Sequence, residues 1–189
     1  MPFDREKIEE GVRLILEGLG GALSDEVVQH TPARVAAAYA EILGGMDMEP
    51  AQMIRVFTQE KYDEMVLVKD IPFYSMCEHH LLPFHGRAHV AYIPGSGRIT
   101  GISKLARVVE AHARRLQLQE RMTQDIADTF THALKPKGVM VVIEAEHLCM
   151  TMRGIKKPGS LTVTSVVTGL FRANPATRAE AMDLIHGRR

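Results

Sequence analysis

The stretch "SKLARVVEAHARRLQ" occupies residues 103–117 and has the apolar spacing of an amphipathic helix. The side chains that fall near one helical face are Leu105, Val108, Val109, His112 and Leu116. A second helical stretch, "TQDIADTFTHALKP" (residues 123–136), follows closely and ends at a proline, which interrupts helices. The middle of the chain therefore predicts two consecutive helices.

Strand-like segments lie on both sides of this helix pair. Before it come "EMVLVKDIPFYS" (64–75) and "GRAHVAYIPGSGRITG" (86–101), and after it come "GVMVVIEAEHLCM" (138–150) and "SLTVTSVVTGLF" (160–171). All four are rich in β-branched and apolar residues, and turn-forming residues separate them. Hairpins around a helix pair predict an α+β fold, in which both helices cover one face of an antiparallel sheet.

The two ends of the chain read as helical. Segments 5–21 and 30–46 carry helical spacing, with Thr31 as the expected N-cap and Pro32 at the expected first position of the second helix. A short helix is expected over residues 50–57, and "PATRAEAMDLIH" (175–186) is expected to form the last helix. We therefore expect an N-terminal helical region over residues 1–60 and a main domain over residues 61–189 that includes this last helix.

Composition excludes several classes of function. The formal net charge is zero, 46% of residues are hydrophobic, and no apolar run reaches 18 residues. No overall electrostatic field attracts nucleic acid, and no segment has the pattern of a signal peptide or a membrane span. We expect a cytoplasmic protein without nucleic-acid or membrane partners. Its two cysteines are then expected to be reduced thiols.

Both cysteines stand close to histidines. Cys77 and His80 form a C-x-x-H pair with His79 between them, while His147 and Cys149 are two residues apart, a spacing that would put both on one face of a strand. Two thiolates with up to three imidazoles suit Zn²⁺. Four protein ligands would make a closed structural site, whereas three would leave a position for water and free the other histidines for acid–base work. The alternative is that the cysteines are buried apolar side chains and the histidines are structural.

Basic residues mark a second possible site. Ser103 is expected to cap the helix that carries Lys104 and Arg107 in its first turn, and a helix start with two cations suits phosphate. Arg153 follows the second cysteine closely. A solvated basic face is the alternative.

Glu120, near the start of the next helix, is either a first-turn acid favoured by the helix dipole or a carboxylate that pairs with a guanine edge. Spacing alone leaves both alternatives open. The histidines without partnered spacing are expected to be structural or exposed, namely His30, His85, His89, His112, His132 and His186.

Four motifs together resemble the zinc-dependent type IA family of GTP cyclohydrolase I. They are "SMCEHHLLPFHGRAHVAYIP", "GISKLARVVE", "LQLQERMTQDIA" and "EAEHLCMTMRGIKKPGSLTVTS". The resemblance implies a tunnelling fold, ββααββ, in a homodecamer of two pentamers with active sites at subunit boundaries. It also implies GTP as substrate, hydrolytic opening of its imidazole ring at C8, release of formate and rearrangement to 7,8-dihydroneopterin triphosphate, the first step of tetrahydrofolate or pterin biosynthesis.

The resemblance implies a role for each matching residue. Cys77, His80 and Cys149 match the zinc ligands, and His79 and His147 match the acid–base histidines. The residues that match those around the ribose and triphosphate are Ser103, Lys104, Arg107 and Arg153. Gln119 and Glu120 match the guanine-binding pair. Two alternatives remain: an enzyme of the same fold that acts on another purine or pterin, and a non-catalytic binding module whose zinc has four protein ligands.

Overall fold

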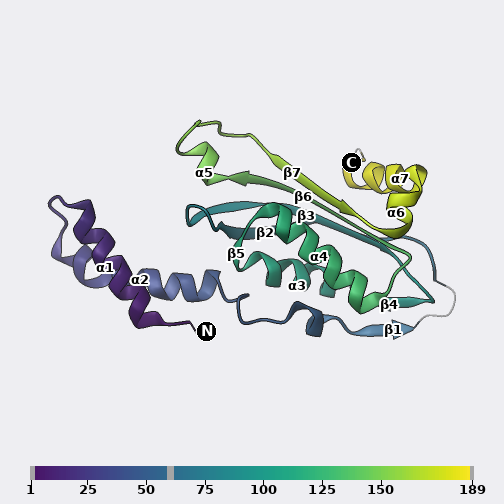
Figure 1. The fold of residues 1–189 in the computed structure, drawn as a ribbon, viewed down its shortest axis with the longest axis horizontal. Helices are drawn as coiled ribbons and strands as arrows, with labels where there is room; N and C mark the ends of the chain where they lie inside the picture. Colours follow the sequence, from purple (N-terminus) through teal and green to yellow (C-terminus); the bar gives the residue numbers. More distant parts are fainter. Residues whose placement is uncertain (1–2, 59–61, 188–189) are drawn as a thin grey trace.

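The structure is a computed structural model that describes residues 3–58 and 62–187, and it has the α+β architecture expected from the sequence (Figure 1). Its main sheet has five strands in the order β5-β2-β3-β6-β7. They are β2 (Val66–Cys77), β3 (Leu82–Ile93), β5 (Leu116–Gln117), β6 (Gly138–His147) and β7 (Thr162–Val167). The pairs β2–β3, β3–β6 and β6–β7 are antiparallel, and the short β5 runs parallel to β2. The ββααββ order implied by the resemblance is therefore confirmed.

Helices α3 (Ile102–Ala113) and α4 (Gln119–Leu134) pack on one face of this sheet (Figure 1). Their buried side chains, such as Val108 and Phe130, join Phe73, Val90 and Val141 from the strands in the main core. Alternate residues of β3 and β6 point into this core because side chains alternate across a strand. The apolar period read from residues 103–117 gives the correct buried face for Leu105, Val108, Val109 and His112, but α3 ends at Ala113 and Leu116 lies in β5.

Two helix starts differ from the sequence expectation. Gly101, not Ser103, is the N-cap of α3, and its carbonyl accepts a hydrogen bond from the Lys104 N–H at 2.8 Å. Helix α4 begins at Gln119, directly after β5, rather than at Thr123. In both cases a strand ends directly before the helix begins: β4 (Arg98–Thr100), in a separate two-stranded sheet, precedes α3, and β5 precedes α4. Strand pairing therefore sets both boundaries.

The opposite sheet face carries α6 (Gly169–Ala173) and α7 (Pro175–His186). Phe171, Ala181 and Ile185 pack there against Met140 and Val142 of β6 in a second core. Lys69 of β2 donates from Nζ to the carbonyl of Leu184 at 2.7 Å, which stabilises the C-terminal end of α7. The expected last helix is confirmed.

The N-terminal helices α1 (Arg5–Leu19) and α2 (Asp25–Ile42) form a hairpin at one end of the molecule (Figure 1). The expected start of α2 at Thr31 and Pro32 is wrong, because Ser24 caps this helix and Pro32 lies inside it. The Ser24 hydroxyl accepts from the Val27 N–H, and Asp25 and Glu26 occupy the first turn. A serine cap followed by two acids is the stronger start signal.

A short segment links this hairpin to the sheet. The helix expected over residues 50–57 is only a 3-10 turn, η1 (Pro50–Met53), and β1 (Val56–Thr58) then pairs with β4 (Arg98–Thr100). The β-branched Ile54 and Val56 favour this extended backbone. The domain boundary expected between residues 60 and 61 lies outside the described residues. Of the helices in the described ranges, none has the length and apolarity needed to cross a bilayer.

Candidate functional site

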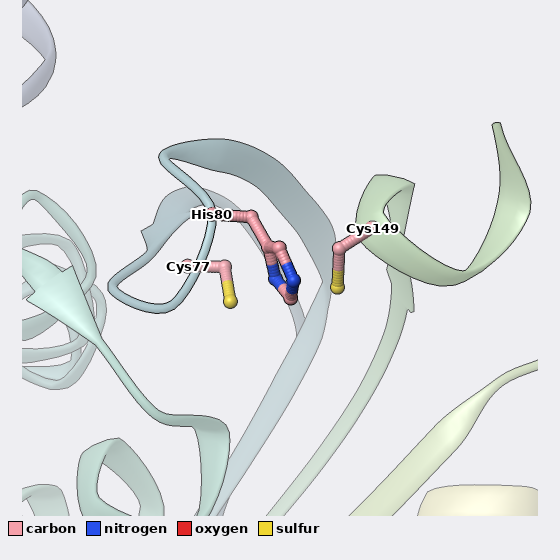
Figure 2. A group of neighbouring side chains, drawn as sticks. All are labelled: Cys77, His80 and Cys149. Atoms are coloured by element: carbon pink, nitrogen blue, oxygen red, sulfur yellow. The ribbon is translucent and has the colours of Figure 1, made fainter. Parts of the chain in front are cut away.

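The β2–β3 hairpin and the end of β6 bring the predicted metal ligands together. Cys77 is the last residue of β2, and His80 lies in the turn that follows. Cys149 lies in α5 (Leu148–Thr151), directly after β6. Figure 2 shows the His80 ring between the two sulfur atoms. One ligand atom from each of the three residues lies within 4.8 Å of the other two.

The route by which Cys149 reaches this cluster differs from the expectation. His147 and Cys149 do not share a strand face, because β6 ends at His147 and the chain turns into α5. The Met152 N–H donates to the Leu148 carbonyl at 3.1 Å and closes this helical turn. His79 and His80 likewise lie in a turn rather than on an extended segment.

The chemistry of these three side chains fits a zinc ion. Burial, and then the neighbouring Cys77 thiol, raise the pKa of the Cys149 thiol, so a divalent cation beside the two sulfurs would favour their ionisation. Arg153 lies with Nη1 3.1 Å from His80 Nε2. A guanidinium cation therefore stands directly beside the proposed histidine ligand.

His147 is held on two sides. Its ring stacks on Phe84 with centroids 4.5 Å apart and planes 2° apart, because Phe84 and His147 are paired across β3 and β6. Its Nε2 lies 2.7 Å from Oε1 of Gln119. Burial lowers the pKa of His147, and Glu120 opposes that shift. His147 is therefore oriented by protein contacts before any substrate binds.

A cavity of about 190 Å³ lies beside the cluster. Six residues singled out from the sequence line it, namely Cys77, His79, Gln119, Glu120, His147 and Cys149. Sequence reasoning missed four others that line it: Gln117, Leu118, Met150 and Thr162. The first three lie within two positions of a predicted site residue in the sequence, and this closeness was the available signal. Thr162 is brought in by the pairing of β7 with β6.

The guanine-binding candidate Glu120 and the cation Arg153 lie near the metal cluster, whereas the anion-binding candidates on α3 lie further along that helix. Glu120 is exposed in the first turn of α4 and lines the cavity. Ser103, Lys104 and Arg107 lie in the first half of α3, while the chain leaving the other end of α3 enters β5, which pairs with Met76 and Cys77. A helix of this length extends roughly 18 Å. Ser103 and Lys104 therefore lie most of the helix length from the end that leads to Cys77, and Arg107 lies about half that length from it.

Comparison with known proteins identifies the family. The family model of GTP cyclohydrolase I matches residues 8–186. The GTP cyclohydrolase 1 of Pelotomaculum thermopropionicum is 62% identical over 98% of this chain and 98% of its own. The GTP cyclohydrolase 1 of Carboxydothermus hydrogenoformans is 60% identical over 96% of this chain and 95% of its own. A crystal structure of an archaeosine synthase QueF-like protein matches 58% of this chain and 97% of its own, with 20% identity and a TM-score of 0.48. The model match and the two full-length relatives place the chain in the GTP cyclohydrolase I family.

Proposed function

We propose that this protein is a zinc-dependent GTP cyclohydrolase I that hydrolyses the GTP imidazole ring at C8, releases formate and forms 7,8-dihydroneopterin triphosphate. The observation that carries this proposal is the cluster of Cys77, His80 and Cys149 beside a cavity lined by His79, Glu120 and His147. Among the described residues this cluster supplies three protein ligands, the number typical of catalytic zinc, whereas a structural site has four. This count argues against the zinc-stabilised binding module.

Zinc and histidines divide the chemistry. When bound by Cys77, His80 and Cys149, Zn²⁺ supplies a Lewis acid and a source of nucleophilic oxygen at neutral pH. His79 and His147 move protons, which the ring opening needs when a guanine ring nitrogen leaves C8 and again during the later rearrangement. Both line the cavity, so both are placed to act on a substrate there.

Glu120 supplies the preference for guanine. Its carboxylate lines the cavity and accepts hydrogen bonds from N1–H and N2–H of the base. Adenine has no such pair of donors, so ATP would leave the carboxylate without partners. The charge on a carboxylate also strengthens each hydrogen bond that it accepts.

The triphosphate is held by residues of more than one subunit. Lys104, Arg107 and Arg153 are the proposed cations, and Ser103 lies beside Lys104 in the first turn of α3. Because α3 starts far from the metal cluster of its own chain, a neighbouring subunit brings its α3 start to that cluster. The cavity of about 190 Å³ is also below the ~300 Å³ at which ligand pockets typically begin, which suits a site completed by a second chain.

We propose that the protein assembles as the homodecamer of two pentamers that the family resemblance implies. In the described residues, β7 is the last strand of the sheet and pairs only with β6. An open edge of this kind favours pairing with another chain. Helix α1 has no buried residue and exposes Leu14, Ile15 and Leu19, which also suits an assembly.

Residues 61–189 would form the catalytic domain, and residues 1–60 the helical region. We place the protein in the cytoplasm, because its ligands must be reduced thiols.

Turnover of GTP tests this function. Purified zinc-loaded protein should convert GTP into a product that becomes a fluorescent pterin on oxidation, with one formate released per GTP. ATP and other purine nucleotides are assayed in parallel, which tests the alternative of another purine substrate on the same fold. Cys149→Ser should abolish both the zinc and the turnover. A zinc-loaded, folded protein that leaves GTP unchanged would disprove the proposal.

A further inference from the structure

Gln119 makes an unusually complete set of contacts for a residue expected to bind a base. Its side chain is only 1% exposed. The amide Nε2 lies 3.1 Å from the Ile143 carbonyl, 3.0 Å from the Thr162 carbonyl and 3.1 Å from Thr164 Oγ1. Backbone carbonyls only accept hydrogen bonds, so the amide nitrogen must face them and Oε1 must point away.

Two threonines are consistent with the same orientation of the amide. Thr123 Oγ1 donates to the main-chain carbonyl of Gln119 at 2.6 Å and lies 2.7 Å from Thr164 Oγ1. Because the Thr123 proton is used in that first bond, the Thr164 hydroxyl donates to Thr123. The Thr164 oxygen is then free to accept from Gln119 Nε2. All the hydrogen bonds in this chain of groups agree on one orientation of the Gln119 amide.

This orientation determines which nitrogen of His147 carries the proton. The Gln119 Oε1 atom lies 2.7 Å from His147 Nε2. An amide oxygen only accepts, so Nε2 must be the donor, and the neutral ring has its lone pair on Nδ1. The parallel stack on Phe84 holds the plane of the same ring. The protein therefore fixes both the tautomer and the orientation of His147.

We propose that Gln119 is a positioning residue that acts on the reaction through His147, because its hydrogen bond to Nε2 and the stack on Phe84 hold the imidazole in one orientation beside the cavity. The resemblance implies a guanine contact for Gln119 instead. Three protein acceptors already surround its two N–H groups, which leaves no donor for the base. This inference rests on the proposed GTP cyclohydrolase activity.

A double-mutant cycle tests the inference. Gln119→Met keeps an unbranched side chain of similar length but cannot hydrogen-bond to His147. In the wild-type background it should lower kcat for GTP at least about tenfold while KM changes less than about twofold, the pattern of a lost orienting group. In a His147→Ala background the same change should cost nothing further, because there is no imidazole left to orient. Single-turnover formate release measures the slow variants.

Binding distinguishes the two roles of Gln119. In the His147→Ala background, equilibrium titration with GTP should give the same dissociation constant with Gln119 or with methionine at this position. A dissociation constant raised tenfold, or a loss of rate that is as large without His147 as with it, would overturn the inference and favour a guanine contact. Inactive wild-type protein would instead overturn the proposed function itself, so the two failures are distinguishable.

Two further variants guard against a general loss of packing. Gln117 is also buried, with 3% exposure, and donates to the His112 carbonyl rather than contacting His147. Any effect of Gln117→Met should therefore be equal in both His147 backgrounds. Thr164→Val removes one acceptor of the Gln119 amide and leaves Gln119 in place. Its loss of kcat should be smaller than that of Gln119→Met and should also vanish without His147. A Thr164→Val effect that persists without His147 contradicts the proposed chain of contacts.

Discussion

His79 and His80 occupy the same turn, yet their surroundings differ. His80 stands between the two thiols (Figure 2), and its Nε2 lies 3.1 Å from Nη1 of Arg153. Both histidines are exposed, but His79 lines the cavity and His80 does not, and their ring centroids lie 6.3 Å apart. The geometry is the one expected if His80 binds zinc and His79 acts on the substrate.

Alanine substitutions at these two histidines should have different effects. His80→Ala should lower zinc content and turnover together, because it removes a ligand. His79→Ala should keep zinc and fold but slow turnover by roughly 10²-fold or more, the usual cost of a lost acid–base group. Metal analysis and a GTP assay on both variants check this. Zinc lost from the His79 variant and kept by the His80 variant would show that the assignments are reversed.

Base selection should depend on Glu120. Glu120→Ala should reduce the preference for GTP over ATP, measured as a ratio of kcat/KM values, by about tenfold or more, because a charged acceptor for two donors is lost. Asp128 lies on the same helix and does not line the cavity, so Asp128→Ala is the matched control. A Glu120 variant that rejects ATP as strongly as the parent would assign guanine recognition to other groups.

Among the secondary elements, the α3–α4 pair contains a buried histidine with a structural role. His112 of α3 is 5% exposed, and its Nε2 lies 2.9 Å from Thr129 Oγ1 of α4. Burial, with a smaller contribution from Arg115, lowers the pKa of His112 to about 4. The sequence expectation that His112 is structural or exposed is consistent with this packing.

This lowered pKa predicts a pH dependence of stability. The unfolded chain binds a proton at His112 near pH 6.5 and the folded chain only near pH 4, so stability is complete above that range and falls as pH decreases through it. When the pH falls from above 6.5 to below 4, the contribution of His112 to the free energy of unfolding decreases by about 3 kcal/mol, at ~1.36 kcal/mol per pKa unit. Urea unfolding of wild type and His112→Gln at several pH values should show curves that converge as pH falls. The difference between the two free energies of unfolding cancels contributions that both proteins share, including those of His89 and the metal ligands. A difference that stays the same at every pH would contradict the prediction.

At the level of the whole protein, the separation of the start of α3 from the metal cluster predicts an active site that is shared between subunits. Sizing of the protein in solution should show a large ring. An active monomer would exclude the assembly and the shared site together. Arg107→Ala should weaken GTP binding by roughly tenfold or more, because charge-assisted bonds to phosphate contribute about 1.5–3 kcal/mol each.

Subunit complementation tests sharing directly. Chains with Arg107→Ala keep the metal ligands, and chains with Cys149→Ser keep the α3 cations. Co-expressed with different tags, they should form mixed rings in which about a quarter of the sites combine two intact halves, if the subunits mix at random. At GTP concentrations well below KM, where weakened binding lowers the rate, mixed rings should therefore exceed the activity of either variant alone. Activity no higher than that of the separate variants would show that each site is built within one chain.

The sequence by itself determined the helix pair and the order of the strands around it, and the family resemblance indicated Cys77, His80 and Cys149 as zinc ligands. The helices and strands depend on local patterns, since side chains repeat every 3.6 residues on a helix and alternate on a strand. Cys77 and His80 are close in the chain and are held by a single turn. The same local rules failed at Ser103 and Pro32, where the preceding strand or a better cap decided where the helix begins.

Only the tertiary structure decided how distant segments combine. The contact between Gln119 and His147 joins residues 28 positions apart, and the path of Cys149 through α5 depends on where β6 leaves the sheet. The distance between the start of α3 and the metal cluster likewise depends on how α3 lies across the sheet. No local pattern encodes such relations, because they follow from the packing of whole strands and helices around one core.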